Sequence, residues 1–412
     1  MEVTLSDLAR QDPKAHEAAD IIRRCVHCGF CTATCPTYQI LGDERDGPRG
    51  RIYMIKKMLE GEPISSETQL HLDRCLTCRN CETTCPSGVE YGRLVDLGRE
   101  MVDHAVPRPL PQRVVRSLLR EGLTSRWFAP AARLGRALRP VLPELLSQKL
   151  PPVADTQLSW PTRQHARKVI LPRGCVQPTL LPNIDGATAV VLDRLGIEAL
   201  ITKESRCCGA VRHHLADGQG ALAEVRRNID AWWPQIASGD IEAIVMNASG
   251  CAVMVRDYGR LLADDKAYAE KAASVSALAR DPIELLAPLL TEIQQRFPKL
   301  SDGKNRMRIA YHPPCTQQHG LKIRGAVERF LSDLGVAIQP VADSHLCCGS
   351  AGTYSVLQPA LAKTLKEQKL EALTAGSPEC ILSANVGCIG HLQSGTPVKV
   401  AHWIEWLEEQ TR

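Results

Sequence analysis

The sequence predicts an α/β fold whose C-terminal half is a duplication, preceded by a separate cysteine-rich domain. Three observations lead to this prediction. Two cysteine cassettes of identical spacing lie near the start, short apolar runs alternate with amphipathic helical stretches in the second half, and one cysteine pattern occurs twice there. The expected domains are residues 1–106, a basic linker at 107–165, and two related domains at 166–300 and 301–412.

The two cassettes share the pattern Cys-x2-Cys-x2-Cys-x3-Cys-Pro, which is typical of proteins that bind [4Fe–4S] clusters. In the two-cluster arrangement, the first three cysteines of a run bind one cluster and the fourth reaches across to the other. This rule predicts one cluster on Cys25, Cys28, Cys31 and Cys85, and a second on Cys75, Cys78, Cys81 and Cys35. We therefore expect the N-terminal domain to transfer electrons.

Zinc and disulfides are the competing explanations for these cysteines. Structural zinc favours two cysteines, a spacer and two further ligands, rather than three cysteines at every third position closed by Cys-Pro. A disulfide framework needs an oxidising compartment, and the chain starts without the charged, apolar and cleavage regions of a secretion signal. We expect reduced, metal-bound thiols and keep a structural zinc protein as an alternative from a different class.

Composition narrows the classes of function. The chain has 412 residues with 44% hydrophobic content, enough for two to four domains with cores of their own. Aromatic residues make up only 4%, which disfavours nucleic-acid binding by base stacking. No window approaches the ~18 consecutive apolar residues of a membrane span, and the sequence offers no GxGxxG turn or P-loop. We expect a soluble or peripherally attached protein without flavin or NAD of its own.

The linker is strongly basic. Residues 107–150 contain nine basic residues against two acidic ones, a net charge of +7 in a chain whose total is +4. Apolar residues recur at helical spacing, first Val114, Val115, Leu118 and Leu119 and then Leu134, Leu138, Val141 and Leu142. Two interpretations stay open. Either these helices lie on an anionic membrane surface with Trp127 and Phe128 alongside, or their apolar sides pack on the protein while their arginines meet water or an acidic partner.

Four short apolar runs predict the strands of parallel sheets. Residues 168–174 lead to Cys175, 242–246 to Cys251, 307–311 to Cys315 and 381–384 to Cys388. Amphipathic helical stretches lie between the runs, as in βαβ units. Because open α/β folds place their ligands at the carboxyl ends of the strands, we expect the cysteines to converge on that edge.

The cysteines show the duplication most clearly. In the first copy, Cys175 is followed after 31 residues by Cys207-Cys208-Gly209, and then by Cys251. In the second copy, Cys315 is followed after 31 residues by Cys347-Cys348-Gly349, and then by Cys388. Buried packing explains single cysteines but not two matched sets of four. We therefore predict a further metal or redox centre in one or both copies.

Other residues near these thiols are left outside the predicted ligand set. Histidines that could bind metal or donate a hydrogen bond are His213, His214, His312 and His345, but single histidines in such places are more often core or surface residues. Cys380 has no counterpart in the first copy and is predicted to be a buried core thiol.

Between the cassettes, the run Gly47-Pro48-Arg49-Gly50-Arg51 predicts the start of a helix that stops at Gly61. This helix either only packs in the core, or it also places the charges of Arg49 and Arg51 near a cluster, whose potential depends on nearby charge.

These segments resemble the iron–sulfur subunit family of bacterial glycolate oxidase. The resemblance rests on residues 25–38, 46–53, 75–86 and 343–354, and it runs over essentially the whole chain. More broadly, the chain is similar to heterodisulfide reductase subunits, the anaerobic glycerol-3-phosphate dehydrogenase small subunit and lactate-utilisation proteins. The resemblance implies a helical, ferredoxin-like domain with two [4Fe–4S] clusters at residues 1–106, followed by two α/β cysteine-rich domains.

The resemblance also implies a function. In this family, flavin-bearing partner subunits oxidise glycolate to glyoxylate, and the iron–sulfur subunit passes the electrons toward a membrane acceptor such as quinone. It implies a place on the cytoplasmic side of the inner membrane and no catalytic residue in this chain. The alternatives are the equivalent subunit for glycerol-3-phosphate or lactate, and a catalytic role of the repeats in disulfide reduction.

One departure from the broader family concerns the last cysteine of each repeat. Heterodisulfide reductase-like domains often end in CxxC, whereas Met254 and His391 stand at the final position after Cys251 and Cys388. A five-thiolate, noncubane cluster would therefore lack one ligand in both copies. An ordinary cluster, zinc and an empty site all stay open for the repeats.

Overall fold

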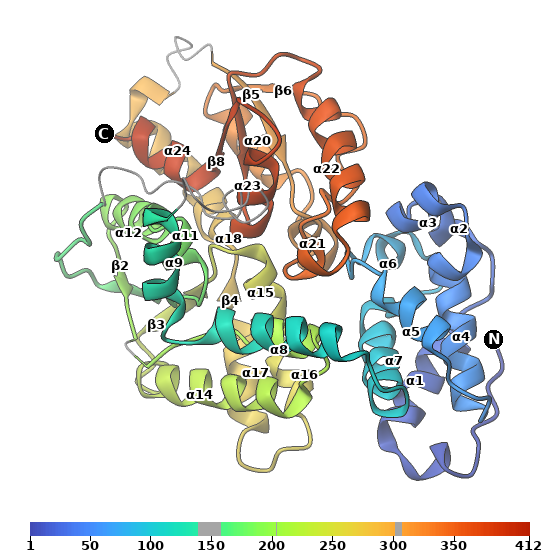
Figure 1. Cartoon of the computed structure of the whole chain (residues 1–412). Helices are drawn as coiled ribbons and strands as arrows, with labels where there is room; N and C mark the ends of the chain where they lie inside the picture. Colours follow the sequence, from blue (N-terminus) through green and yellow to red (C-terminus); the bar gives the residue numbers. More distant parts are fainter. Residues whose placement is uncertain (139–157, 203, 301–306) are drawn as a thin grey trace.

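The N-terminal region is a helical unit at one side of the molecule (blue in Figure 1). The computed structural model describes residues 1–138, 158–202, 204–300 and 307–412. The elements of this unit are η1 (Ala9–Gln11), α1 (Pro13–Arg23), α2 (Phe30–Ala33), α3 (Pro36–Leu41), η2 (Glu44–Asp46), α4 (Pro48–Leu59), α5 (Ser66–Asp73), α6 (Asn80–Thr84) and α7 (Tyr91–Ala105). The helical character that the resemblance implies for this region is confirmed.

The longer helices of this unit bury one apolar face each. Ile22 of α1, Ile55 of α4 and Leu94 of α7 are fully buried in a common core. Helix α4 begins at Pro48 and ends just before Gly61, which has a φ of +91°, so the predicted start and stop are confirmed.

Each cassette folds as a loop, a one-turn helix and a Cys-Pro step. The second and fourth residues after the first cysteine are left-handed in both loops: His27 and Gly29 have φ of 60° and 84°, and Thr77 and Arg79 have φ of 53° and 58°. A left-handed residue other than glycine costs on the order of 1 kcal/mol. The same strained path in both cassettes therefore indicates that both loops are shaped to surround something.

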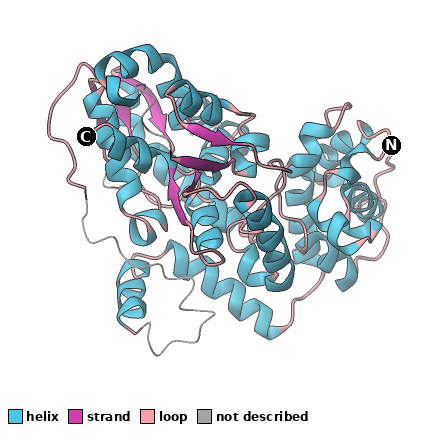
Figure 2. Cartoon of the chain, turned by 90° about the horizontal axis from the view of Figure 1, so that it is seen from above, coloured by secondary structure: helices cyan, strands magenta, loops and turns pink. Residues whose placement is uncertain are grey.

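The second half contains two four-stranded parallel sheets of identical topology. The first has the order β2-β1-β3-β4 and the second has the order β6-β5-β7-β8. The strands are β1 (Arg167–Ile170), β2 (Ile197–Leu200), β3 (Ile241–Val245), β4 (Ala279–Arg280), β5 (Arg308–His312), β6 (Ala337–Gln339), β7 (Cys380–Ser383) and β8 (Lys399–His402). Figure 2 shows the strands grouped on one side of the molecule, away from the N-terminal unit.

Helices cover both sheets, as the alternation in the sequence predicts. In the first repeat they are α11 (Gln177–Leu180), α12 (Asn183–Arg194), α13 (Ala210–His214), α14 (Gly218–Ala237), α15 (Ser249–Arg256), α16 (Tyr258–Leu261), α17 (Ala269–Leu278), α18 (Pro282–Leu286), η4 (Ala287–Leu289), α19 (Leu290–Arg296) and η5 (Pro298–Leu300). In the second they are η6 (Thr316–Gly320), α20 (Ala326–Asp333), α21 (Tyr354–Leu357), α22 (Pro359–Thr374), α23 (Val386–Gln393) and α24 (Trp403–Gln410).

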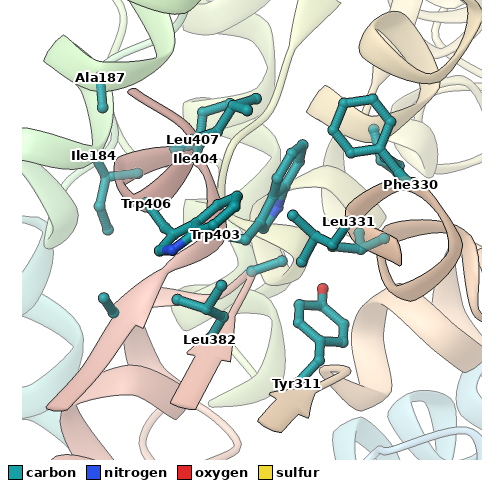
Figure 3. Close-up of a cluster of buried hydrophobic side chains, with 14 of the residues drawn as sticks. Ile184, Ala187, Tyr311, Phe330, Leu331, Leu382, Trp403, Ile404, Trp406 and Leu407 are labelled. Carbon is teal, nitrogen blue, oxygen red and sulfur yellow. The ribbon is translucent and has the colours of Figure 1, made fainter. Parts of the chain in front are cut away.

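The two repeats share one hydrophobic core. Figure 3 shows Trp406 and Leu407 of α24 on the side of Ile184 and Ala187 of α12, and all four side chains are buried in one cluster with both sheets. Removing a side chain as large as that of Trp403 from such a core costs about 3–5 kcal/mol. The repeats therefore stabilise each other across their boundary.

The described part of the basic linker forms two helices, α8 (Leu110–Thr124) and α9 (Phe128–Ala137), and α8 crosses the front of the molecule in Figure 1. No side chain of α8 is fully buried, and Leu110 and Leu118 are 70% and 68% exposed. The interpretation in which the apolar side of these helices packs on the protein is therefore wrong for α8. The linker residues Val141 and Leu142 lie outside the described residues.

The basic side of α8 faces the protein because acidic side chains of the neighbouring domains pair with its arginines. Arg116 lies 3.8 Å from both Asp73 and Asp103 of the N-terminal unit, and Arg120 lies 3.6 Å from Asp217 of the first repeat. These ion pairs hold the helix with Arg116 and Arg120 toward the protein and with Leu110 and Leu118 outward.

Candidate iron–sulfur and metal centres

The first cassette and the end of the second line one cavity. Its wall contains the thiol-bearing residues Cys25, Cys28, Cys31, Cys81 and Cys85. Cys28 is exposed, while Cys25, Cys31 and Cys85 are half-buried, so this cavity lies at the surface. Burial, and after it the neighbouring thiols of Cys25 and Cys85, raise the pKa of Cys31 to about 11. The structure gathers the four thiols predicted for one cluster in a place where bare thiolates would repel one another.

The second cavity is lined by Cys35 together with Cys75, Cys78 and Cys81. Cys35, Cys75 and Cys81 are buried and Cys78 is half-buried, so this cavity is more enclosed than the first. Cys35 therefore lies with the triplet of the other cassette, as the crossed pattern requires. Four thiols around one cavity, reached by loops of matched left-handed geometry, suit a cubane cluster, which needs four thiolates.

Hydrogen bonds reach the sulfur atoms of the second cavity. The Thr37 hydroxyl lies 3.3 Å from Cys35 Sγ, the Thr77 N–H donates to Cys75 Sγ at 3.4 Å, and the Tyr91 hydroxyl donates to Cys75 Sγ at 3.7 Å. Hydrogen bonds to sulfur are one of the factors that set the potential of a bound cluster.

Arg51 brings a fully buried positive charge to the wall of the second cavity. Its Nε donates to the His71 carbonyl at 2.8 Å, and its Nη2 lies 3.4 Å from Asp46 Oδ1. Burial alone lowers the pKa of Arg51, but Tyr91, Cys75 and the other acidic groups around it together raise it. Of the two interpretations of this helix, the geometry favours the one that places charge beside a cluster. Arg49 lines the first cavity and pairs with Glu44 at 2.5 Å.

The thiols of the first repeat meet at the carboxyl edge of its sheet. Cys175 follows β1, Cys207 and Cys208 follow β2, and Cys251 lies in the first turn of α15 after β3. The Sγ atoms of Cys175 and Cys207 are 3.5 Å apart, and hydrogen bonds with Cys175 and Cys208 hold the pKa of Cys207 far below its ordinary value. Convergence on the strand ends is confirmed for this repeat.

The second repeat places its thiols in the same way. The Sγ atoms of Cys315 and Cys347 are 3.8 Å apart, and all four cysteines of the set are buried. Gly349, after the Cys-Cys pair, has a φ of +86°, and a Cβ there would lie 2.6 Å from the Ala362 carbonyl oxygen. Glycine is thus required for the turn that brings two adjacent cysteines to the site. Cys380 is buried within β7, as predicted.

The second cavity lies beside the thiols of the second repeat. Leu76, Cys315, Cys347 and Tyr354 belong to one buried cluster, and Cys78 packs against it. The Tyr354 hydroxyl donates to the Arg74 carbonyl at 3.1 Å. Tyr354 is the last residue of one of the motifs recognised in the sequence, but its partner could not be predicted there, because Arg74 lies in another domain.

His213 and His214 lie at a domain contact. His213 Nε2 and His214 Nδ1 are each 3.3 Å from a carboxylate oxygen of Asp96 in α7. They therefore bind the first repeat to the N-terminal unit rather than approaching the cysteines.

Comparisons with known proteins agree with this architecture. Residues 21–89 match the 4Fe-4S dicluster domain, and residues 170–256 and 309–393 each match the cysteine-rich domain. The chain is 50% identical to the glycolate oxidase iron–sulfur subunit of Escherichia coli (strain K12), over 99% of both chains. It belongs to the glycolate oxidase iron–sulfur subunit family. Members of this family are subunits of an oxidoreductase, and the match of the cysteine-rich domain to both repeats confirms the duplication.

More distant relatives of the family also match. The chain is 27% identical to the probable glycolate oxidase iron–sulfur subunit of Bacillus subtilis (strain 168), covering 90% of this chain and 88% of that one. It is 27% identical to lactate utilization protein A of an Exiguobacterium species, covering 57% of this chain and 94% of that one. Among the described residues, none of the helices has the length and apolar character needed to cross a membrane.

Proposed function

We propose that this chain is the electron-transfer subunit of a flavin-dependent glycolate oxidase, which carries electrons from a flavin-bearing partner toward a membrane acceptor such as quinone. The observation that supports this most is the order of thiol sites, from a surface cavity to an enclosed cavity and on to the second repeat. Oxidation of glycolate to glyoxylate releases two electrons and two protons. Two one-electron carriers in series can accept these electrons one at a time. The two protons are released in the flavin-bearing partner.

In this proposal, one [4Fe–4S] cluster is held by Cys25, Cys28, Cys31 and Cys85, and the other by Cys35, Cys75, Cys78 and Cys81. When bound, the clusters supply one-electron redox chemistry. The chain's own residues hold the thiols in place, bury most of the thiols of the second cavity and bring hydrogen-bonding groups to their sulfur atoms. Leu76 lines that cavity and is buried in one cluster with Tyr354 and Cys347, so the two sites adjoin each other.

The test is to purify the complex anaerobically from its native host through a tag on this chain. We expect a copurifying flavoprotein, and we expect glycolate to produce the EPR signals of reduced clusters. Purification without any flavoprotein, or reduction by glycerol 3-phosphate or lactate but not by glycolate, would contradict the glycolate assignment. Disulfide reduction by the isolated chain would instead favour a catalytic role for the repeats. Iron analysis adds a count: about eight irons per chain means the N-terminal clusters alone, and about twelve or sixteen adds the repeats.

The outward face of α8 and α9 suggests where the subunit meets the membrane. Trp127 and Leu134 are 64% and 63% exposed, much as Leu118 of α8 is 68% exposed. Exposed arginines flank these residues, and one of them, Arg126, lies over the Trp127 ring at 5.5 Å. Apolar and tryptophan side chains bordered by arginine fit an anionic lipid surface better than a neutral protein surface. We propose that this face rests on the cytoplasmic side of the inner membrane.

Liposomes containing anionic lipid test this surface. We expect the double variant Val114→Asp, Leu118→Asp to lose most of its binding to the vesicles, because two charges would enter the apolar layer. Leu8→Asp is the matched control, since Leu8 is 83% exposed elsewhere on the surface. Unchanged vesicle binding would contradict the membrane proposal, and loss of the flavoprotein instead would show that the face binds a protein.

A further inference from the structure

His312 is the last residue of β5, at the edge of the second sheet where the thiols gather. Its side chain is buried, and neither ring nitrogen has a hydrogen-bond partner among the described residues. A polar group buried without a partner costs about 1–3 kcal/mol. The Ser383 hydroxyl donates to the His312 carbonyl at 2.9 Å, so the backbone is fixed while the ring is left without a partner.

The ring points at two of the thiols. A ring nitrogen of His312, Cys348 Sγ and Cys388 Sγ all lie within 4.8 Å of one another. Two ligand atoms on one tetrahedral metal ion, at bond lengths of about 2.0–2.3 Å, lie about 3.3–3.8 Å apart, and ligands on neighbouring irons of a cluster lie farther apart. Small side-chain adjustments would therefore let all three bind a single centre.

We propose that His312 is a ligand, with Cys348, Cys388 and the adjoining thiols Cys315 and Cys347, of an iron–sulfur cluster in the second repeat. The first repeat has Pro172 at the same distance before its first cysteine, so it offers no imidazole at this position. The two repeats, although duplicates in fold, thus hold different centres. His391, which stands where related domains have a final cysteine, does not take this place, because its Nε2 lies 3.3 Å from the Ala362 carbonyl oxygen.

Two observations favour a cluster over zinc here. Four thiols and one imidazole exceed the four ligands of a structural zinc ion, and they equal in number the five ligands of the noncubane cluster that the thiols alone cannot complete. The site also adjoins Cys78 of the second cavity, where a redox centre can receive electrons. An imidazole in place of a thiolate removes one negative charge and raises the potential of a cluster. Such a centre would act as the electron acceptor of the second cavity, a role that depends on the relay proposed above.

The experiment uses the full-length chain, purified anaerobically with ¹⁵N-labelled histidine and reduced with dithionite. Pulsed EPR is expected to show a third cluster signal with a directly bound ¹⁵N nucleus. The coupling should vanish in His312→Ala and persist in His345→Ala, a matched control whose residue stands two positions before Cys347. His312→Cys should keep the iron, lose the coupling and lower the midpoint potential of this cluster alone.

The labelled wild-type protein tests whether a histidine binds the third cluster even if the variants fold poorly. A third signal without nitrogen coupling, no third signal at all, or one zinc per chain bound in the second repeat would each overturn the assignment. Because dithionite replaces the natural donor, these results do not depend on glycolate. If glycolate fails to reduce the complex while the coupling is present, the proposed function is wrong and the ligand assignment stands.

Discussion

The two N-terminal cavities have cysteines at identical spacing but different surroundings. The first is open, with Cys28 exposed and the apolar side chains of Val26 and Phe30 68% and 61% exposed beside it. The second is enclosed and has the buried cation Arg51 in its wall. Cysteine spacing therefore determines the path of each loop, whereas residues elsewhere in the chain determine the solvent exposure and the charge of each site. In the proposed relay, the first cavity would therefore receive the electrons at the surface, and the second would carry them into the protein.

The crossed ligand pattern should produce the largest effect. Cys35→Ser is expected to abolish the cluster of the enclosed cavity and to leave the cluster of its own cassette's triplet, because Cys35 lines the other cavity. Cys85→Ser is the reciprocal variant and should abolish the cluster of the open cavity. EPR that resolves the two clusters, with iron analysis, measures this. Loss of the Cys25, Cys28, Cys31 cluster in Cys35→Ser would refute the crossed pattern.

Stability should depend strongly on the carboxylate beneath the enclosed cavity. Asp46 is fully buried, lies 3.0 Å from His71 Nδ1 and accepts from Arg74 Nη1 at 2.9 Å, in addition to its contact with Arg51. Asp46→Ala leaves the buried guanidinium of Arg51 without its counter-charge, which costs about 3–5 kcal/mol. Calorimetry should show a lower unfolding temperature for the N-terminal unit.

Asp43→Ala is the control, since it removes a partly exposed carboxylate paired with Arg45. It should change stability by less than ~1 kcal/mol. Equal losses of stability in the two variants would mean that burial of the Asp46 network does not add to the stability of the N-terminal unit.

The potentials of the two clusters should differ in their response to arginine. At an effective dielectric constant of ~20 and a distance of ~8 Å, one charge contributes about 2 kcal/mol, or roughly 90 mV for one electron. Arg51→Gln is therefore expected to lower the midpoint potential of the enclosed cluster by this order. Arg51→Lys keeps the charge and should shift it much less. Redox titration followed by EPR measures both.

Arg49→Gln extends the comparison to the open cavity. Arg49 is partly exposed and paired with Glu44, so water and the carboxylate screen its charge. We expect a shift of about 20 mV or less in the open cluster. A larger shift for Arg49 than for Arg51 would contradict the contrast drawn between the two sites.

Exposure to oxygen should give the smallest difference. Because Cys28 is exposed and the thiols of the enclosed cavity are mostly buried, the open cluster should be lost first on exposure to air. The decay of the two EPR signals over time measures the order. Simultaneous loss would mean that the enclosure of the second cavity does not protect it.

The sequence was most informative where function requires short local patterns. The cassettes, the duplication and the four central strands follow from spacing and apolar runs, and β1, β3, β5 and β7 lie within a few residues of the predicted runs. The edge strands β2, β4, β6 and β8 were not predicted. They have only two to four residues each, a run too short to distinguish a strand from the neighbouring helices by its apolar pattern.

What the sequence could not show are contacts between distant segments. Hydrophobic periodicity identified α8 as amphipathic, but the acids that turn its basic side inward, such as Asp73 and Asp217, come from two other domains. The contacts of the His312 ring could not be predicted for the same reason. Its nearness to Cys388 depends on the pairing of β5 with β7, and its lack of a hydrogen-bond partner depends on full burial.

The core shared by α12 and α24 also orders events during synthesis on the ribosome. Residues 183–194 emerge long before residues 403–410, yet their buried faces contact each other. The first repeat therefore cannot complete its core until the second is translated, and part of its apolar surface stays exposed to solvent until then. The helical N-terminal unit has a core of its own and can close earlier. Cells should accordingly be able to load the two cassettes with iron and sulfide before translation of the second repeat ends.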